Sequence, residues 1–225
     1  MSQCKSVAID GPSGAGKSTM VKRLARELGF VYVDTGAIYR TLGLFALRTG
    51  ADPGDWAQVE PLLPRVAIRM DYGSDGLQHM YLGDEDVTEA IRRPEVSDAA
   101  SRISAIPQVR AFLMDMQRDM ARTHSVVMDG RDIGTVVLPG ADVKLFLTAS
   151  AEERARRRCA ELRDRGTPVE YETVLADILE RDARDSGRSA APLKQAEGAA
   201  LIDTTGLSLE ESFRLLLRTV REKLA

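Results

Sequence analysis

The chain has 225 residues, of which 44% are hydrophobic and 29% charged, with a formal net charge of −3, and this predicts one soluble globular domain, or one domain with a large insertion, burying about 70% of its unfolded surface. The acidic balance argues against a general nucleic-acid binder. Two widely spaced cysteines, no N-terminal secretory signal and no stretch of roughly 18 apolar residues predict a cytoplasmic protein with no membrane partner.

The first predicted strand, SVAID (6–10), runs into GPSGAGKS (11–18), which fits the pattern G-x-x-x-x-G-K-[ST], and a helix over 19–29 follows. The glycines let backbone amides converge on phosphate oxygens, and the helix N-terminus adds its positive end. Lys17 supplies a point charge, and Ser18 supplies a hydroxyl for Mg²⁺. The predicted ATP-binding loop consists of Gly11, Pro12, Ser13, Gly14, Ala15, Gly16, Lys17, Ser18 and Thr19.

A second short strand, 30–33, leads into a helix that we expect to end at about residue 48. The next fifty residues have a different texture, because 65–72 and 77–82 read as a β-hairpin around the turn GSDG, with an acidic loop after it. We interpret this region as an insertion beside the main sheet. A helix that starts at Pro107 and ends at about residue 123 returns the chain to the sheet.

The second half of the chain resumes the alternation of strands and helices. The runs 125–129 and 143–149 are apolar enough to be buried on both faces, and 199–203 supplies a fifth strand. Two strongly charged helices are expected within 151–188, separated by RGTPVE (165–170). The pattern predicts an α/β fold with a mostly parallel five-stranded sheet, helices on both faces, and ligand sites at the carboxyl ends of the strands.

A phosphate-binding loop alone does not separate an enzyme from a nucleotide-dependent switch. The chain has no N-K-x-D segment of the kind that reads guanine in GTPases, and it is too short for a transport ATPase module with its own signature. A kinase that moves phosphate to a small acceptor therefore fits best. Such an enzyme also needs cations for the acceptor, a reader of its specific group and a cover that excludes water.

Three charged stretches are candidates for these tasks: DTGAIYR (34–40), DGRD (129–132) and RDARDSGR (181–188). In the last one, the three arginines 181, 184 and 188 and Asp185 share a helix face at i, i+3, i+4 and i+7. A solvated helix surface is one interpretation of this stretch. Its excess of positive charge instead favours a site that binds the phosphates of two nucleotides.

Taken in order, GPSGAGKS, DTGAIYR, GDEDVTEAIRRPEVSDAAS, PQVR, DGRDIGTVV and ERDARDSGRSAAPL resemble the bacterial cytidylate kinase family over nearly the entire chain. The resemblance implies the fold of P-loop nucleoside monophosphate kinases, with a monophosphate-binding insertion that contains a small antiparallel sheet. The implied division is a core of 1–35, 103–150 and 189–225, an insertion of 36–102, an ATP lid at about 151–168 and a charged helix at 170–188.

The resemblance also implies roles for individual residues. The residues that would hold CMP through its phosphate or sugar are Thr35, Arg40, Arg131, Arg181, Asp185 and Arg188. Those that would read the base are Ser101, Arg110 and Asp132. Lys17, Arg131, Arg181 and Arg188 would be catalytic. Arg154, Arg157 and Arg158 would contact ATP from the lid, although a solvated helix would carry arginines there too.

The base assignment also makes chemical sense. A carboxylate such as that of Asp132 suits the 4-amino donor of cytosine, whereas it would face the O4 acceptor of uracil without a hydrogen bond. The expected reaction is ATP + (d)CMP giving ADP + (d)CDP, with Mg²⁺ held by Ser18 and, through water, by Asp34 or Asp129. We expect a monomer. A UMP/CMP, adenylate or shikimate-type kinase and a regulatory P-loop NTPase stay as alternatives.

Overall fold

The computed structural model describes residues 4–73, 76–164 and 166–224. Two residues of the predicted GSDG turn and the first residue of the predicted break RGTPVE lie outside these ranges. Within them, the predicted alternation of strands and helices is confirmed. No helix in the described ranges is both long enough and apolar enough to cross a membrane.

The central sheet has five strands in the order β2-β6-β1-β7-β8, and every pair in it is parallel. Its strands are β1 (Ser6–Asp10), β2 (Val31–Asp34), β6 (Val126–Gly130), β7 (Val143–Thr148) and β8 (Ala200–Asp203). These are the five predicted strands, shifted by at most one residue at either end. The predicted α/β class and the mostly parallel sheet are therefore confirmed.

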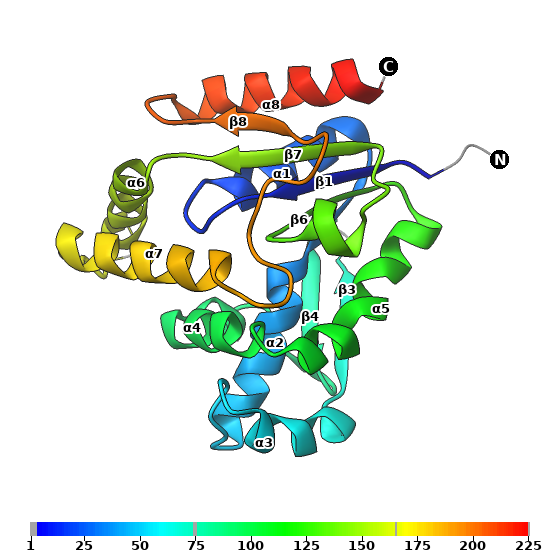
Figure 1. Ribbon diagram of the computed structural model, residues 1–225, viewed down its shortest axis with the longest axis vertical. Coiled ribbons are helices and arrows are strands. Elements are labelled where there is room, and N and C mark those ends of the chain that lie inside the picture. The colour runs from blue at the N-terminus through cyan, green and yellow to red at the C-terminus, as the bar shows by residue number, and fades with distance from the viewer. Residues whose placement is uncertain (1–3, 74–75, 165, 225) are drawn as a thin grey trace.

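Helices cover both faces of this sheet (Figure 1). The helices α1 (Lys17–Leu28) and α8 (Leu209–Leu224) pack on the face that carries Val7 and Ile9 of β1. The opposite face carries Ala8, which lies in an apolar cluster with methionines of α5 (Pro107–Thr123). Successive residues of β1 thus face opposite layers, as the two-residue period of a strand requires.

The region of the predicted insertion contains a second sheet, in the antiparallel order β3-β4-β5. Its elements are α2 (Thr35–Arg48), α3 (Trp56–Val59), η1 (Glu60–Arg65), β3 (Ile68–Tyr72), β4 (Gln78–Leu82), β5 (Glu85–Asp86), η2 (Ala90–Arg92) and α4 (Pro94–Ile103). Its apolar cluster runs from Ala37 to Leu113, so the first half of α5 packs with the insertion.

The charged second half supplies α6 (Ala151–Asp164) and α7 (Tyr171–Ser186), which pack together through Ala155, Val174 and Ile178. Figure 1 shows both helices beside the carboxyl end of the sheet, with α7 running above α4. A short π-helical segment, η3 (Ile133–Val137), follows β6. Because β1, β2 and β6 are neighbours in the sheet and all point the same way, the loops that follow them meet at this one edge.

Candidate active site

The phosphate-binding loop wraps around its own lysine. The Lys17 ammonium donates to the carbonyl oxygens of Gly11 at 2.8 Å and Pro12 at 2.6 Å. Burial, reinforced by the charge of Arg131, holds the pKa of Lys17 well below its ordinary value. Gly11 has no room for a side chain, since a Cβ there would lie 1.9 Å from the Leu147 carbonyl oxygen. The loop therefore lies directly against β7, and no carboxylate of the described residues forms an ion pair with Lys17.

The neighbouring strands β1, β2 and β6 place Asp10, Asp34 and Asp129 together as buried carboxylates. Asp129 accepts from the hydroxyls of Tyr32 at 3.2 Å and Ser18 at 3.4 Å. Burial and the nearby charge of Asp34 raise the pKa of Asp129 to about 6. Hydroxyl and carboxylate oxygens are the ligands that Mg²⁺ prefers, so the pair of Ser18 and Asp129 fits a magnesium ion.

Asp34 is occupied differently, because two arginines share one of its oxygens. Arg40 of α2 donates to Asp34 Oδ2 at 2.7 Å, and Arg92 of η2 donates to the same atom at 3.2 Å. The other oxygen caps α2 at the backbone N–H of Ala37. Although burial opposes it, the charges of Arg40 and Arg92 lower the pKa of Asp34. Asp34 is therefore better suited to hold the two arginines than to hold a metal ion.

The predicted clamp RDARDSGR brings its charges into the interior. Asp185 is 1% exposed and accepts from Arg131 Nε at 2.8 Å and from Arg188. Arg188 lies two residues past the end of α7 and reaches back to Asp185. The predicted solvated-surface alternative fits Arg184, which pairs with Asp98 and Glu180, but not its buried neighbours.

Arg181 is the unusual member of this group. Within the described part of the chain its guanidinium has no hydrogen-bond or ion-pair partner, and its Nε is buried. Burial, with the positive charges of Arg131, Arg40 and Arg188 close by, lowers the pKa of Arg181 to about 10. The charge of Asp185 partly opposes this effect. A partly buried cation among other cations, with no carboxylate bonded to it in the described residues, indicates a site that binds an anion.

The three predicted base-reading residues lie together beside this clamp. Arg110 and Asp132 form an ion pair in which each side chain is only 6% exposed. Arg110 also donates to the Ser104 carbonyl oxygen at 3.1 Å. The hydroxyl of Ser101 is buried and has no hydrogen-bond partner among the described residues, while its carbonyl oxygen lies 3.5 Å from Arg188 Nη2. Thr35, also predicted for CMP, donates to the Asp129 carbonyl oxygen at 2.8 Å.

The three predicted lid arginines have different surroundings. Arg154 lies against the phosphate loop: it donates to the Ser13 carbonyl oxygen at 3.0 Å and binds Asp182 through both terminal nitrogens at 3.2 and 2.6 Å. Arg157 instead bonds Glu153 and the loop after β8. Arg158 pairs with Glu161 on its own helix. Only Arg154 of the three contacts the phosphate loop within the described residues.

Three residues of the site did not stand out in the sequence: Asp10, Gln78 and Arg92. Gln78 of β4 bonds both the N–H and the carbonyl oxygen of Asp34, at 2.8 and 3.2 Å, which ties the insertion to the core. Asp10, directly before the phosphate loop, was the only one with a visible signal, because a carboxylate there is poorly placed for solvent at the end of a buried strand.

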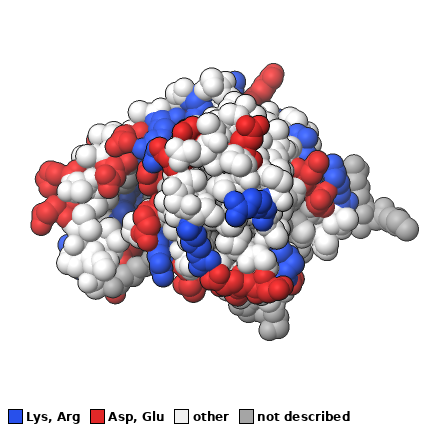
Figure 2. Space-filling model, turned by 90° about the horizontal axis from the view of Figure 1, so that it is seen from below, with Lys and Arg blue, Asp and Glu red and all other residues white. Residues whose placement is uncertain are grey.

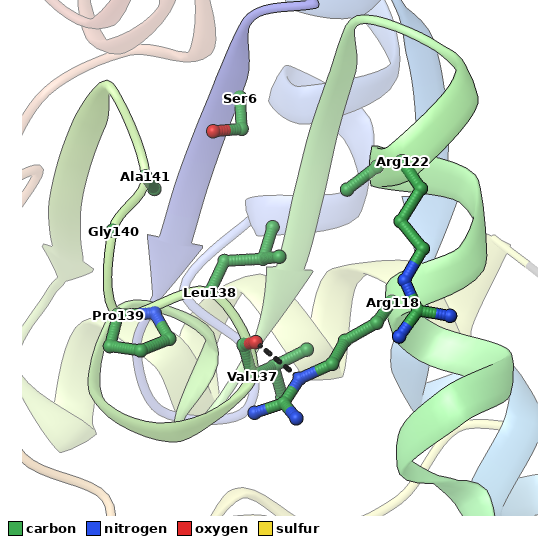
Figure 3. A pocket seen from close by; sticks show the side chains of 9 residues that line it. Ser6, Arg118, Arg122, Val137, Leu138, Pro139, Gly140 and Ala141 are labelled. Carbon is green, nitrogen blue, oxygen red and sulfur yellow. Dashed lines mark hydrogen bonds between the residues drawn. The ribbon is translucent and has the colours of Figure 1, made fainter.

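Acidic and basic side chains are interspersed over the face seen in Figure 2, with wide uncharged areas between them. A cavity lined by residues 137–141 and by Ser6, Arg118 and Arg122 lies at the opposite end of β1 (Figure 3). Arg118 is held there by the Val137 carbonyl oxygen at 2.9 Å. None of the predicted site residues lines this cavity.

Comparisons with known proteins found similar sequences and a similar fold. The sequence model described as cytidylate kinase matches residues 7–222. A cytidylate kinase of Caldanaerobacter subterraneus subsp. tengcongensis is 51% identical over 216 residues, which cover 96% of this chain and 94% of that protein. One of Carboxydothermus hydrogenoformans is 48% identical over 217 residues, covering 96% and 97%. The solved structure of an uncharacterized protein from Eubacterium ventriosum, 12% identical, shares the fold with a TM-score of 0.52 over 96% of this chain and 98% of that one.

Proposed function

The chain belongs to the cytidylate kinase family, and on that premise we propose that it transfers the γ-phosphoryl group of ATP to CMP or dCMP, giving ADP and CDP or dCDP. The observation that carries the proposal is the partly buried Arg181, which has no hydrogen-bonded or ion-paired carboxylate within the described residues and lies near Arg40, Arg131 and Arg188. This cluster stands beside Lys17 of the phosphate loop. A dianionic acceptor phosphate beside the donor phosphates would neutralise it.

The donor side is assigned to residues 11–19. Backbone N–H groups of the loop and the N-terminus of α1 would bind the phosphates of ATP. Lys17 would exchange its two carbonyl partners for phosphate oxygens, which offer its charge a far better partner. Ser18 and Asp129 would hold Mg²⁺, which neutralises charge on the donor phosphates when it is bound.

The acceptor side is assigned to the clamp and to the base pocket. Arg40, Arg131, Arg181 and Arg188 would bind the phosphate of CMP, and Asp185 would accept from the ribose hydroxyls. The Asp132 carboxylate would accept a hydrogen bond from the 4-amino group of cytosine. Arg110 and Ser101 would donate hydrogen bonds to the acceptor atoms of the base. The hydroxyl of Ser101 supports this assignment, because it is buried with no hydrogen-bond partner among the described residues and a bound base would supply one.

Transfer needs alignment more than proton chemistry. A monophosphate oxygen is already anionic near neutral pH, so no strong general base is required. Lys17 and the arginines would hold the attacking oxygen and the γ-phosphoryl group in line and stabilise the charge spread over the transferred group. Arg131 is bonded to Asp185, which fixes its side chain before substrate arrives, so less entropy is lost on binding.

We further propose that the insertion 36–102 carries CMP, that about 151–168 is the ATP lid and that 170–188 joins the two. The separate apolar cluster of the insertion supports a division from the core. The contacts of Arg154 with the phosphate loop support a lid next to ATP. We expect a cytoplasmic monomer, and the unpaired Cys4 and Cys159 fit a reducing compartment.

A coupled assay of ADP release with ATP, Mg²⁺ and CMP, dCMP, UMP, AMP, GMP or shikimate, each offered separately, tests the function. We expect the highest kcat/KM with CMP and dCMP, because of the two pyrimidines cytosine and uracil only cytosine offers an amino donor at C4 to the buried carboxylate. Equal rates with UMP or AMP would favour the broader nucleotide-kinase alternative. ADP release that needs no acceptor would instead identify a regulatory NTPase and contradict the proposal.

A further inference from the structure

Asp10 bridges the two halves of the active site. It is the last residue of β1, directly before the phosphate loop, and it is 2% exposed. One carboxylate oxygen accepts the backbone N–H of Ile133 at 2.7 Å, and the other accepts that of Gly134 at 2.8 Å. A single side chain of β1 thus closes both bonds to the segment that follows Asp132.

The two donors are the first free N–H groups of η3. The first amides of a helical segment have no partner within the segment and must find one elsewhere. Asp132 provides no side-chain cap for η3, because its own carboxylate is turned to Arg110. The Asp10 carboxylate takes over that task from a neighbouring strand. It leaves the Asp132 side chain free to face the base pocket.

The segment packs closely against its neighbours at Gly134. A Cβ at Gly134 would lie 3.4 Å from Asp10 Oδ2 and 3.2 Å from the Cβ of Ala196. Asp132 itself adopts φ −146° and ψ 26°, outside the regular helix and strand regions, directly before η3. The position of its carboxylate therefore depends on where the Ile133 and Gly134 amides are anchored.

We propose that Asp10 is a positioning residue for base selection: its carboxylate anchors the backbone after Asp132 and so sets the place of the group that accepts the cytosine amino proton. Asp10 does not touch either substrate in this role. The inference rests on the proposed function, since it assigns Asp132 to the base. It adds that discrimination between cytosine and uracil depends on a residue of the donor-side strand.

The test is Asp10→Asn, which keeps the size of the side chain but offers one acceptor to two N–H groups. One buried amide then loses its partner and the segment shifts. We expect the ratio of kcat/KM for CMP to that for UMP to fall about tenfold, while the KM for ATP stays within about twofold. The affinity of the protein for CMP, measured by calorimetry without ATP, should fall in parallel.

Asp142→Asn is the matched control. Like Asp10, Asp142 accepts a hydrogen bond from a backbone N–H through its carboxylate. The donor is Ser6 at 2.8 Å, at the end of β1 that lies away from the site. This variant should lose stability without a change in the CMP:UMP ratio. An unchanged CMP:UMP ratio in D10N overturns the inference. A D10N chain that fails to fold also overturns it, because the carboxylate would then support the sheet as a whole. If wild-type protein does not phosphorylate CMP, the proposed function itself fails.

Discussion

At the scale of single residues, the active site holds more buried positive charge than its own carboxylates neutralise. Asp34 is shared by two arginines, and Asp185 by two more, while Arg181 has no partner within the described residues. Desolvating an unpaired guanidinium destabilises the fold, so the free protein is less stable than an uncharged variant would be. A bound anion would remove this destabilisation, and the free energy recovered would contribute to binding.

The raised pKa of Asp10 gives a prediction for the pH dependence of stability. Burial outweighs the two backbone donors and raises the pKa of Asp10 from 3.8 to about 6. The nearest charges are those of Asp132, which raises this pKa, and Lys17, which lowers it. The folded chain therefore binds the proton more tightly than the unfolded chain does, and Asp10 stabilises the fold at acid pH but loses this contribution as pH rises from about 4 to about 6.

Asp10→Asn removes this titration, so its free energy of unfolding should improve relative to that of wild type by on the order of 3 kcal/mol between about pH 4 and pH 7. Urea unfolding of both proteins at several pH values measures the difference. The hydrogen bond lost in the variant lowers its free energy of unfolding by the same amount at every pH, so it does not affect how the difference between the two proteins changes with pH. A difference in free energy of unfolding that does not change with pH, or that increasingly favours wild type as pH rises, would contradict the raised pKa of Asp10.

At the scale of elements, α6 and α7 are fastened to the phosphate loop by one side chain. Arg154 has five N–H donors, of which four are used: one by the Ala149 carbonyl oxygen, one by that of Ser13 and two by Asp182. Since Ser13 belongs to the loop and Asp182 to α7, the guanidinium links the donor site to the helix of the acceptor clamp.

Arg154→Met should lower the free energy of unfolding by about 2–3 kcal/mol, because it leaves the Ser13 carbonyl oxygen and the Asp182 carboxylate without their partner. It should also raise the KM for ATP severalfold, since the loop loses its support. Arg158→Met on the same helix is the control: in the part of the chain that the structure describes, Arg158 pairs only with the exposed Glu161, and its loss should cost less than about 0.5 kcal/mol. Equal effects of the two substitutions on stability and KM would refute this role of Arg154.

The elements themselves were predictable from the sequence, because their signals are local. Hydrophobic runs bounded by turn residues located all five parallel strands, and the spacing around Pro107 located α5. The short strand β5 was missed, since Glu85 and Asp86 have low strand propensity and pair with β4 only because the chain turns back there. The spacing 181, 184, 185 and 188 predicted a shared face but not which arginine would lack a partner. That depends on Asp98, Asp34 and the 129–132 loop, which are distant in sequence.

At the scale of the whole molecule, the site lies where two bodies with separate apolar clusters meet. One cluster fills the insertion and the first half of α5, and the others cover the faces of the central sheet. Arg40 comes from the insertion side, whereas Arg131 and Arg181 come from the loop after β6 and from α7. A bound phosphate would therefore contact elements from both sides of the site, and this favours closure around the substrate.

The most direct test of this central claim compares the affinities of CMP and cytidine, measured by calorimetry, for wild-type protein and for Arg181→Met. Wild type should bind CMP much more tightly than cytidine. In R181M this preference should fall at least about tenfold, because the phosphate loses a buried charge-assisted partner. The free energy of unfolding of the ligand-free variant should rise by about 1–3 kcal/mol, since a desolvated cation is gone. An unchanged preference for CMP, together with reduced stability, would show that Arg181 supports the fold rather than the acceptor phosphate.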